Sequence, residues 1–171
     1  YIKSVTVYCS SSNKIDKSYF NIAKKLGVYL AQKKINLIYG GGSNGLMGAI
    51  SESVVSNKGY VIGIIPSFLK TKENINYNLN KLVVVNTMAK RKKLLFDKGD
   101  AFIVLPGGIG TLEELSETTS WLNLGLHKKP IIIFNYKNFW DPLIKMLKKM
   151  NNKKFLDKNY NKIIYLVKNI S

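Results

Sequence analysis

Short apolar runs alternate with helical segments from one end of the 171-residue chain to the other, and this alternation limits the possible folds more than any other feature. Largely hydrophobic strands of this kind are typical of a parallel sheet covered on both faces. We predict such strands at 5–8, 35–39, 60–65, 82–85, 101–105, 131–134 and 163–167. Helical spacing of apolar residues predicts helices at 18–32, 45–56, 88–97, 111–124 and 139–149. The expected fold is therefore α/β, a Rossmann-like doubly wound parallel sheet with helices on both faces, in a single domain of residues 1–171.

Composition narrows the possible functions. No apolar run approaches the roughly 20 residues needed to span a bilayer, so no membrane partner is expected. The one cysteine, Cys9, rules out an internal disulfide and favours a cytoplasmic location. Cys9 and the one histidine, His127, lie far apart in the sequence, so no metal site is predicted. We interpret His127 as a packing residue of a loop or helix end.

The net charge of +17 is large enough to raise the question of nucleic-acid binding. Lysine supplies nearly all of the positive charge, and it is spread over 14–34, 70–98 and 145–168 without forming one tract. We therefore predict no dedicated nucleic-acid binding. A general attraction of anionic small molecules is expected all the same.

Two glycine-rich turns each follow a predicted strand and open a predicted helix, an arrangement that presents backbone N–H groups to a phosphate. The first turn, residues 40–45, has the spacing G-x-G-x-x-G, and the second contains Gly107, Gly108 and Gly110. A dinucleotide site also needs an acidic residue about 20 positions after the first turn, and apolar residues 61–66 stand there instead. NAD is therefore disfavoured. Both turns follow strand ends, so a mononucleotide could touch both.

Thr111 and Glu114 have two interpretations. A Thr-x-x-Glu sequence at a helix start forms a capping box, in which the hydroxyl and the carboxylate each accept from a free backbone N–H. That interpretation accounts for Thr111 and leaves the three preceding glycines unexplained. In the second interpretation, the backbone N–H groups of the glycines bind a phosphate, and the carboxylate of Glu114 is a functional group next to that phosphate. Spacing alone leaves both open. Two interpretations also apply to the serines after the first strand: their hydroxyls either bind a phosphate or cap the next helix. These serines are Ser10, Ser11 and Ser12.

The basic run at 88–95 supplies a cation for the same edge of the sheet. Helical geometry places Arg91 beside the line that faces the core and turns Lys90 and Lys93 away from it. A guanidinium on the inward side needs a partner because an unpaired buried charge is very costly. A phosphate or Glu114 would satisfy it.

These stretches together resemble the Lonely Guy (LOG) family of phosphoribohydrolases, often mislabelled as lysine decarboxylases. The family signature Pro-Gly-Gly-x-Gly-Thr-x-x-Glu is met in full by residues 106–114, and the similarity continues through 40–48, 61–66, 100–102, Trp121 and 127–130. Two departures stand out. The family commonly reads Met-His-Glu-Arg-Lys where residues 88–92 read Met-Ala-Lys-Arg-Lys, and it has a glycine where this chain has Ser10.

The resemblance implies hydrolysis of the N-glycosidic bond of an adenosine 5′-monophosphate, often N6-substituted, to the free base (a cytokinin or adenine) and ribose 5-phosphate. It also implies a homodimer that needs no metal or organic cofactor. Arg91 and Glu114 are the expected catalytic residues. The expected substrate-binding residues are Ser11, Gly42, Ser43, Met88, Lys92, Gly107, Gly108, Gly110 and Thr111.

Three alternatives stay open. A non-catalytic carrier of a nucleotide or cofactor would use the same fold and the same phosphate seat. A true lysine decarboxylase would need a pyridoxal phosphate site, for which the sequence offers no candidate lysine. A basic nucleic-acid binder would be recognised by retention on DNA that depends on salt.

Overall fold

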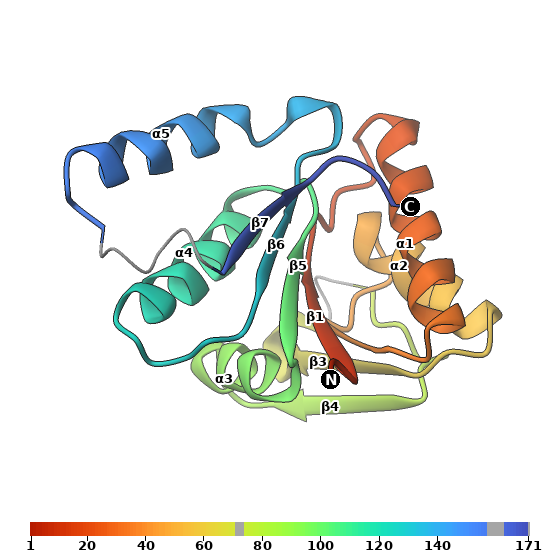
Figure 1. Cartoon of the computed structure of the whole chain (residues 1–171). Helices are drawn as coiled ribbons and strands as arrows, with labels where there is room; N and C mark the ends of the chain where they lie inside the picture. The colour runs from red at the N-terminus through yellow and green to blue at the C-terminus, as the bar shows by residue number, and fades with distance from the viewer. Residues whose placement is uncertain (71–73, 157–162, 171) are drawn as a thin grey trace.

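The computed structural model describes residues 1–70, 74–156 and 163–170. Within them, seven strands form one sheet in the order β4-β3-β2-β1-β5-β6-β7, and every neighbouring pair is parallel (Figure 1). The strands are β1 (Ser4–Tyr8), β2 (Asn36–Tyr39), β3 (Val61–Pro66), β4 (Lys81–Val85), β5 (Ala101–Val104), β6 (Ile131–Phe134) and β7 (Ile164–Val167). The chain winds outward from β1 to β4, crosses to β5, and winds outward again to β7. The predicted Rossmann-like α/β fold is confirmed.

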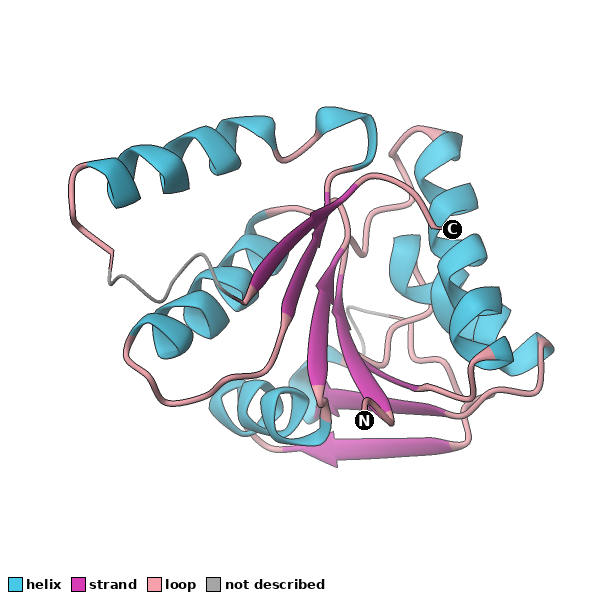
Figure 2. Cartoon of the chain, viewed as in Figure 1, coloured by secondary structure: helices cyan, strands magenta, loops and turns pink. Residues whose placement is uncertain are grey.

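Helices cover both faces of this sheet (Figure 2). They are α1 (Lys17–Gln32), α2 (Gly45–Ser56), α3 (Met88–Lys98), α4 (Ile109–Asn123) and α5 (Asp141–Asn152), with short 3-10 turns at Ser67–Leu69 and Tyr136–Asn138. Leu26 of α1 and Ile50 of α2 belong to the core on one face of the sheet. Leu95 of α3 and Leu115 of α4 belong to the core on the other. Both cores bury the central strands that the sequence pattern predicts, whereas the edge strands β4 and β7 are partly exposed.

Helix α4 begins earlier than the sequence predicts. Gly108 is its N-cap, so the helix starts at Ile109 and Thr111 already lies inside the first turn. The capping-box interpretation is therefore wrong, because that motif requires threonine at the N-cap position itself. The Thr111 side chain is buried against Gly107, where an added Cβ would come within 2.1 Å of the Thr111 hydroxyl oxygen. Gly107 is needed for that close packing.

The polar, asparagine-rich sequence of residues 70–81 predicts a surface excursion with little structure of its own, and the described part of the segment differs from that prediction. Ile75 forms an antiparallel bridge with Gly42, and the backbone N–H of Asn76 donates to the carbonyl of Gly41. The Asn76 side chain is buried and donates to the hydroxyl of Ser51. The segment therefore packs along the first glycine-rich turn. Residues 71–73 of the predicted excursion lie outside the described residues.

None of the helices in the described part of the chain combines the length and apolar character that a bilayer crossing requires.

Candidate functional site

A hollow of about 290 Å³ lies at the carboxyl ends of β1 and β5, where the winding of the sheet reverses. Open α/β sheets bind their ligands at this position. The loop after β1, the start of α4 and the inner side of α3 form its walls. Six of the residues predicted from the sequence line it together, namely Ser11, Arg91, Gly108, Gly110, Thr111 and Glu114.

The N-terminus of α2, after the first glycine-rich turn, is already occupied by protein groups. The backbone N–H of Gly45 donates to Asn13 Oδ1 at 2.7 Å. The next two amides, those of Leu46 and Met47, donate to the carbonyl oxygen of Ser10 at 2.9 and 3.3 Å. Because these three N–H groups have partners, the first turn offers few donors to a phosphate.

The N-terminus of α4 differs in this respect. Its N-cap, Gly108, provides no side-chain cap. A Cβ built at Gly108 or at Gly110 would meet nothing within 4 Å, so the space above these residues is open. Unoccupied backbone N–H groups at a helix N-terminus attract anions through hydrogen bonding and the helix dipole. The second glycine-rich turn is therefore the better candidate of the two for an anion-binding site, called the anion seat below.

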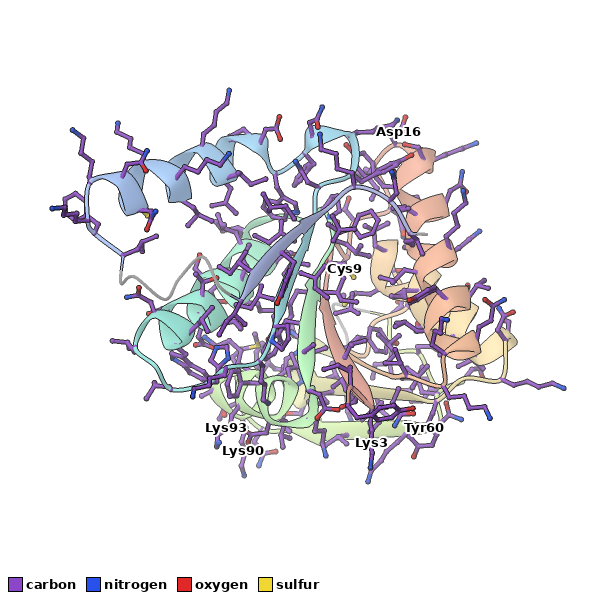
Figure 3. All side chains as sticks on the ribbon, viewed as in Figure 1. Lys3, Cys9, Asp16, Tyr60, Lys90 and Lys93 are labelled. Carbon is purple, nitrogen blue, oxygen red and sulfur yellow. The ribbon has the colours of Figure 1, made fainter. Side chains whose placement is uncertain are left out.

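Arg91 lies inside the protein, as the helical pattern predicts, with 6% of its surface exposed. Its Nε donates to the carbonyl of Ile64 at 3.1 Å and its Nη2 donates to the carbonyl of Gly40 at 2.9 Å. These carbonyls lie within β3 and just after β2, so the backbone of two neighbouring strands fixes the guanidinium. By contrast, Lys90 and Lys93 lie on the outer side of α3 (Figure 3).

Glu114 is half-buried in the second turn of α4 and shares the hollow with Arg91. Burial raises the pKa of the Cys9 thiol, and the charge of Glu114 raises it further. Burial also raises the pKa of the Tyr8 phenol; its hydrogen bond with Thr118 opposes that effect, and the charge of Glu114 adds to it. The carboxylate therefore lies close to both side chains at the end of β1. Figure 3 shows Cys9 in the interior of the molecule, beside that strand.

Five predicted binding residues do not line this hollow, namely Gly42, Ser43, Met88, Lys92 and Gly107. Met88 opens α3 outside it, and Gly107 lines a neighbouring hollow of about 270 Å³ on the α1 side. The carbonyl of Gly42 accepts from the Tyr39 hydroxyl at 3.0 Å. The amide and the hydroxyl of Ser43 both donate to the carbonyl of Asn74, at 2.7 and 2.8 Å.

Lys92 also lies outside the hollow, in an ion-pair network between two helices. Its Nζ is 2.8 Å from Glu113 Oε1 and 2.9 Å from Glu117 Oε2. The hydrogen bonds that Lys92 donates to Glu113 and to Glu117 raise the pKa of its ammonium group. Lys92 thus links α3 to α4 outside the hollow.

Sequence reasoning missed several residues of the hollow, including Tyr8, Gly40 and Met47. Gly40 carried a signal, because three consecutive glycines at a strand end indicate a close approach, in this case by Arg91. Tyr8 and Met47 carried none beyond their places at the end of a strand and the start of a helix.

His127 packs as predicted. Its ring lies 5.0 Å from that of Phe96 and 5.9 Å from that of Phe102, and its Nε2 is 2.9 Å from the carbonyl of Thr118. Burial lowers its pKa, the hydrogen bond to Thr118 opposes that, and the charge of Lys129 adds to it. Within the described ranges, no group of three or more His, Cys, Asp and Glu side chains could hold a metal ion.

Fold and site together define a class. The chain is a Rossmann-like α/β protein whose site combines an open helix N-terminus, a buried arginine and a glutamate at the point where the sheet reverses.

Comparison with known proteins identifies the family. The family model described as "possible lysine decarboxylase" matches residues 47–171. A cytokinin riboside 5′-monophosphate phosphoribohydrolase of Arabidopsis thaliana is 38% identical over 162 residues, which are 95% of this chain and 76% of the relative. An enzyme of the same name from Rhodococcoides fascians is 41% identical over 143 residues, 83% of this chain and 72% of the relative. The chain therefore belongs to the LOG family, to which the earlier resemblance pointed.

Solved structures share the fold. A structural-genomics target with 25% identity has a TM-score of 0.74, over 97% of this chain and 91% of that one. The molybdenum cofactor carrier protein of Chlamydomonas reinhardtii has the same TM-score at 16% identity, over 97% of this chain and 89% of that one. At such low identity the carrier shows the fold alone.

Proposed function

We propose that this protein hydrolyses the N-glycosidic bond of adenosine 5′-monophosphates, including N6-substituted ones, to the free base and ribose 5-phosphate. One observation carries the proposal. Arg91 and Glu114 line the same hollow as the open N-terminus of α4, so a cation, a carboxylate and an anion seat meet at one point. Relatives with 38–41% identity over most of the chain carry the name of this activity, which supports the choice of reaction.

The 5′-phosphate binds at the N-terminus of α4. The backbone N–H groups of Gly108, Gly110 and Thr111 donate to its oxygens, and the helix dipole adds to the attraction. The glycines are required because the space above them must admit a phosphate. Ser11, on the opposite wall, is within the same hollow and contributes a hydroxyl.

Glu114 acts at the ribose. As the bond from C1′ to N9 of the base breaks, positive charge develops on the sugar ring, as in other glycoside hydrolysis. A carboxylate held in a partly buried site stabilises that charge more than one in water. The carbonyls of Gly40 and Ile64 hold Arg91 in place. From that position within the hollow, Arg91 fixes Glu114 and the ligand.

The reaction balances with water alone. The water oxygen bonds to C1′, the C1′–N9 bond breaks with its electron pair going to the base, and one proton of the water is transferred to the departing base. The sugar product keeps its phosphate in the α4 seat until release.

A direct assay tests this function. The protein is incubated with AMP and with N6-isopentenyl-AMP, and free base is measured by chromatography. Glu114→Gln should lower the rate of base release by at least about 100-fold and leave AMP affinity within a few-fold, since the substitution removes charge and keeps shape. Glu113→Gln is the matched control, because Glu113 is exposed and pairs with Lys92 outside the hollow. Full activity of Glu114→Gln would overturn the assignment.

The alternative of a non-catalytic carrier makes the opposite prediction in this assay. A carrier would bind AMP and release no base from either substrate. The presence of both Arg91 and Glu114 in the hollow favours the enzyme.

We further propose that residues 1–171 form one domain and that the protein is cytoplasmic and assembles as a homodimer. Three large apolar side chains on and just after α4 support an interface there, with Ile109, Leu124 and Leu126 exposed by 83%, 67% and 68%. Ile109 also lines the hollow, so a second copy would border the site. Sedimentation at micromolar concentration tests the dimer, and a monomer would overturn it.

A further inference from the structure

Two hydroxyl groups in series join the last residue of β1 to α4. The hydroxyl oxygen of Tyr8 lies 3.4 Å from Thr118 Oγ1, and Thr118 Oγ1 lies 2.8 Å from the backbone carbonyl oxygen of Glu114. A carbonyl oxygen only accepts, so the single hydroxyl hydrogen of Thr118 goes to Glu114. Tyr8 is therefore the donor in the other hydrogen bond. The pair forms a directed relay from Tyr8 through Thr118 to the backbone of Glu114.

The tyrosine end of this relay is fixed. Only 4% of Tyr8 is exposed, and its ring stacks on that of Phe102 in β5, with centroids 5.8 Å apart and planes 13° from parallel. Because burial raises the pKa of the phenol far above neutrality, Tyr8 keeps its proton and remains a donor. The threonine end is equally confined, since Thr118 is 3% exposed.

The relay joins two walls of the hollow where the proposed chemistry takes place, although Thr118 itself does not line it. The end of β1 and the start of α4 form two of its walls, and Tyr8 and Glu114 both line it. Thr118 lies four residues beyond Glu114 on α4, about one helical turn. The hydrogen bond between Tyr8 and Thr118 therefore sets the distance between the end of β1 and the turn of α4 that carries Glu114.

We propose that Tyr8 is a positioning residue: through Thr118 it holds the turn of α4 that carries Glu114 at the correct distance from the ribose. This inference rests on the proposed hydrolysis. Small displacements of a reacting group have large effects on rate and small effects on ligand affinity. Loss of the relay should therefore lower kcat and leave KM nearly unchanged.

The test uses the full chain and five variants, one of them a double variant, in the AMP hydrolysis assay. Tyr8→Phe removes the donor and keeps the ring stack, and it should lower kcat by roughly three- to tenfold with KM within about twofold. Thr118→Val breaks the relay at its centre and should have a similar effect. Combined with Tyr8→Phe, it should add little, because each change alone already breaks the relay. Thr118→Ser keeps the hydroxyl and should retain the wild-type kcat. Tyr60→Phe, at an exposed tyrosine before β3, is the control.

Three results would overturn the inference: a wild-type kcat in Tyr8→Phe, a loss that appears only in KM, or losses that multiply in the double variant. Circular dichroism and urea unfolding establish that each variant is folded, and Thr118→Ser separates loss of the hydroxyl from general disturbance of α4. The activity of the wild-type protein is measured before any variant is compared. If the wild-type protein releases no base, the proposed function itself is overturned.

Discussion

Replacing Gly40 by alanine places a methyl group against the guanidinium of Arg91. The new Cβ would lie 2.3 Å from Arg91 Nη2 and 3.0 Å from Met47 Sδ, and carbon and nitrogen do not approach so closely without displacement. The φ angle of Gly40 lies outside the left-handed region, so alanine strains the side-chain packing and leaves the backbone conformation acceptable. Arg91 must therefore move away from the end of β2.

The cost follows from the contacts that Arg91 loses. Its hydrogen bonds to the carbonyls of Gly40 and Ile64 measure 2.9 and 3.1 Å and are buried. A hydrogen bond from a charged group contributes about 1.5–3 kcal/mol, so losing one should reduce the free energy of unfolding by that amount. For a chain of this size the melting temperature should fall by roughly 3–12 °C. Activity should fall by about 100-fold, because a displaced guanidinium no longer fixes Glu114 and the ligand.

Urea unfolding and AMP hydrolysis measure the two effects. The decisive comparison repeats Gly40→Ala in an Arg91→Met background, where the guanidinium is absent. There the destabilisation by Gly40→Ala should shrink to less than about 1 kcal/mol, since only the contact with Met47 remains. Equal destabilisation in both backgrounds would refute the argument that Gly40 makes room for Arg91.

Further predictions concern groups around the hollow and in the core. Gly108→Ala puts a methyl into open space, so AMP affinity should fall at least about tenfold with unfolding free energy within about 0.5 kcal/mol of wild type; unchanged affinity would count against the α4 seat. Because burial raises the pKa of the Cys9 thiol, iodoacetamide at pH 8 should label the folded protein far more slowly than the urea-unfolded chain, as mass spectrometry would show. Burial lowers the pKa of His127 from 6.5, so the unfolded chain binds its proton more readily; stability should be complete above pH 6.5 and decline as pH falls below it, and His127→Gln should remove that slope in urea titrations.

Strand and helix positions were largely predictable because their signal is local. The continuous hydrophobic runs appear as the strands of the parallel sheet, buried at its centre and partly exposed at its two edges. The inward orientation of Arg91 followed from helical spacing alone. The start of α4 was predicted two residues late, since a glycine N-cap carries no capping side chain to recognise. The course of residues 74–76 was unpredictable, because an antiparallel bridge to Gly42 depends on where two distant segments meet.

The sequence by itself determined the fold class and the family, because hydrophobic period, glycine-rich turns and the Pro-Gly-Gly-x-Gly-Thr-x-x-Glu signature are properties of adjacent residues. The sequence alone could not decide which of the two glycine-rich turns has backbone N–H groups available for an anion, because both stand between a predicted strand and a predicted helix. Only the tertiary structure decided between them: Asn13 and the Ser10 carbonyl occupy the amides of α2, whereas the N-terminus of α4 has no side-chain cap and opens onto the hollow. The physical reason is that a backbone N–H can bind a ligand only if no other part of the chain has reached it first, and that depends on long-range packing.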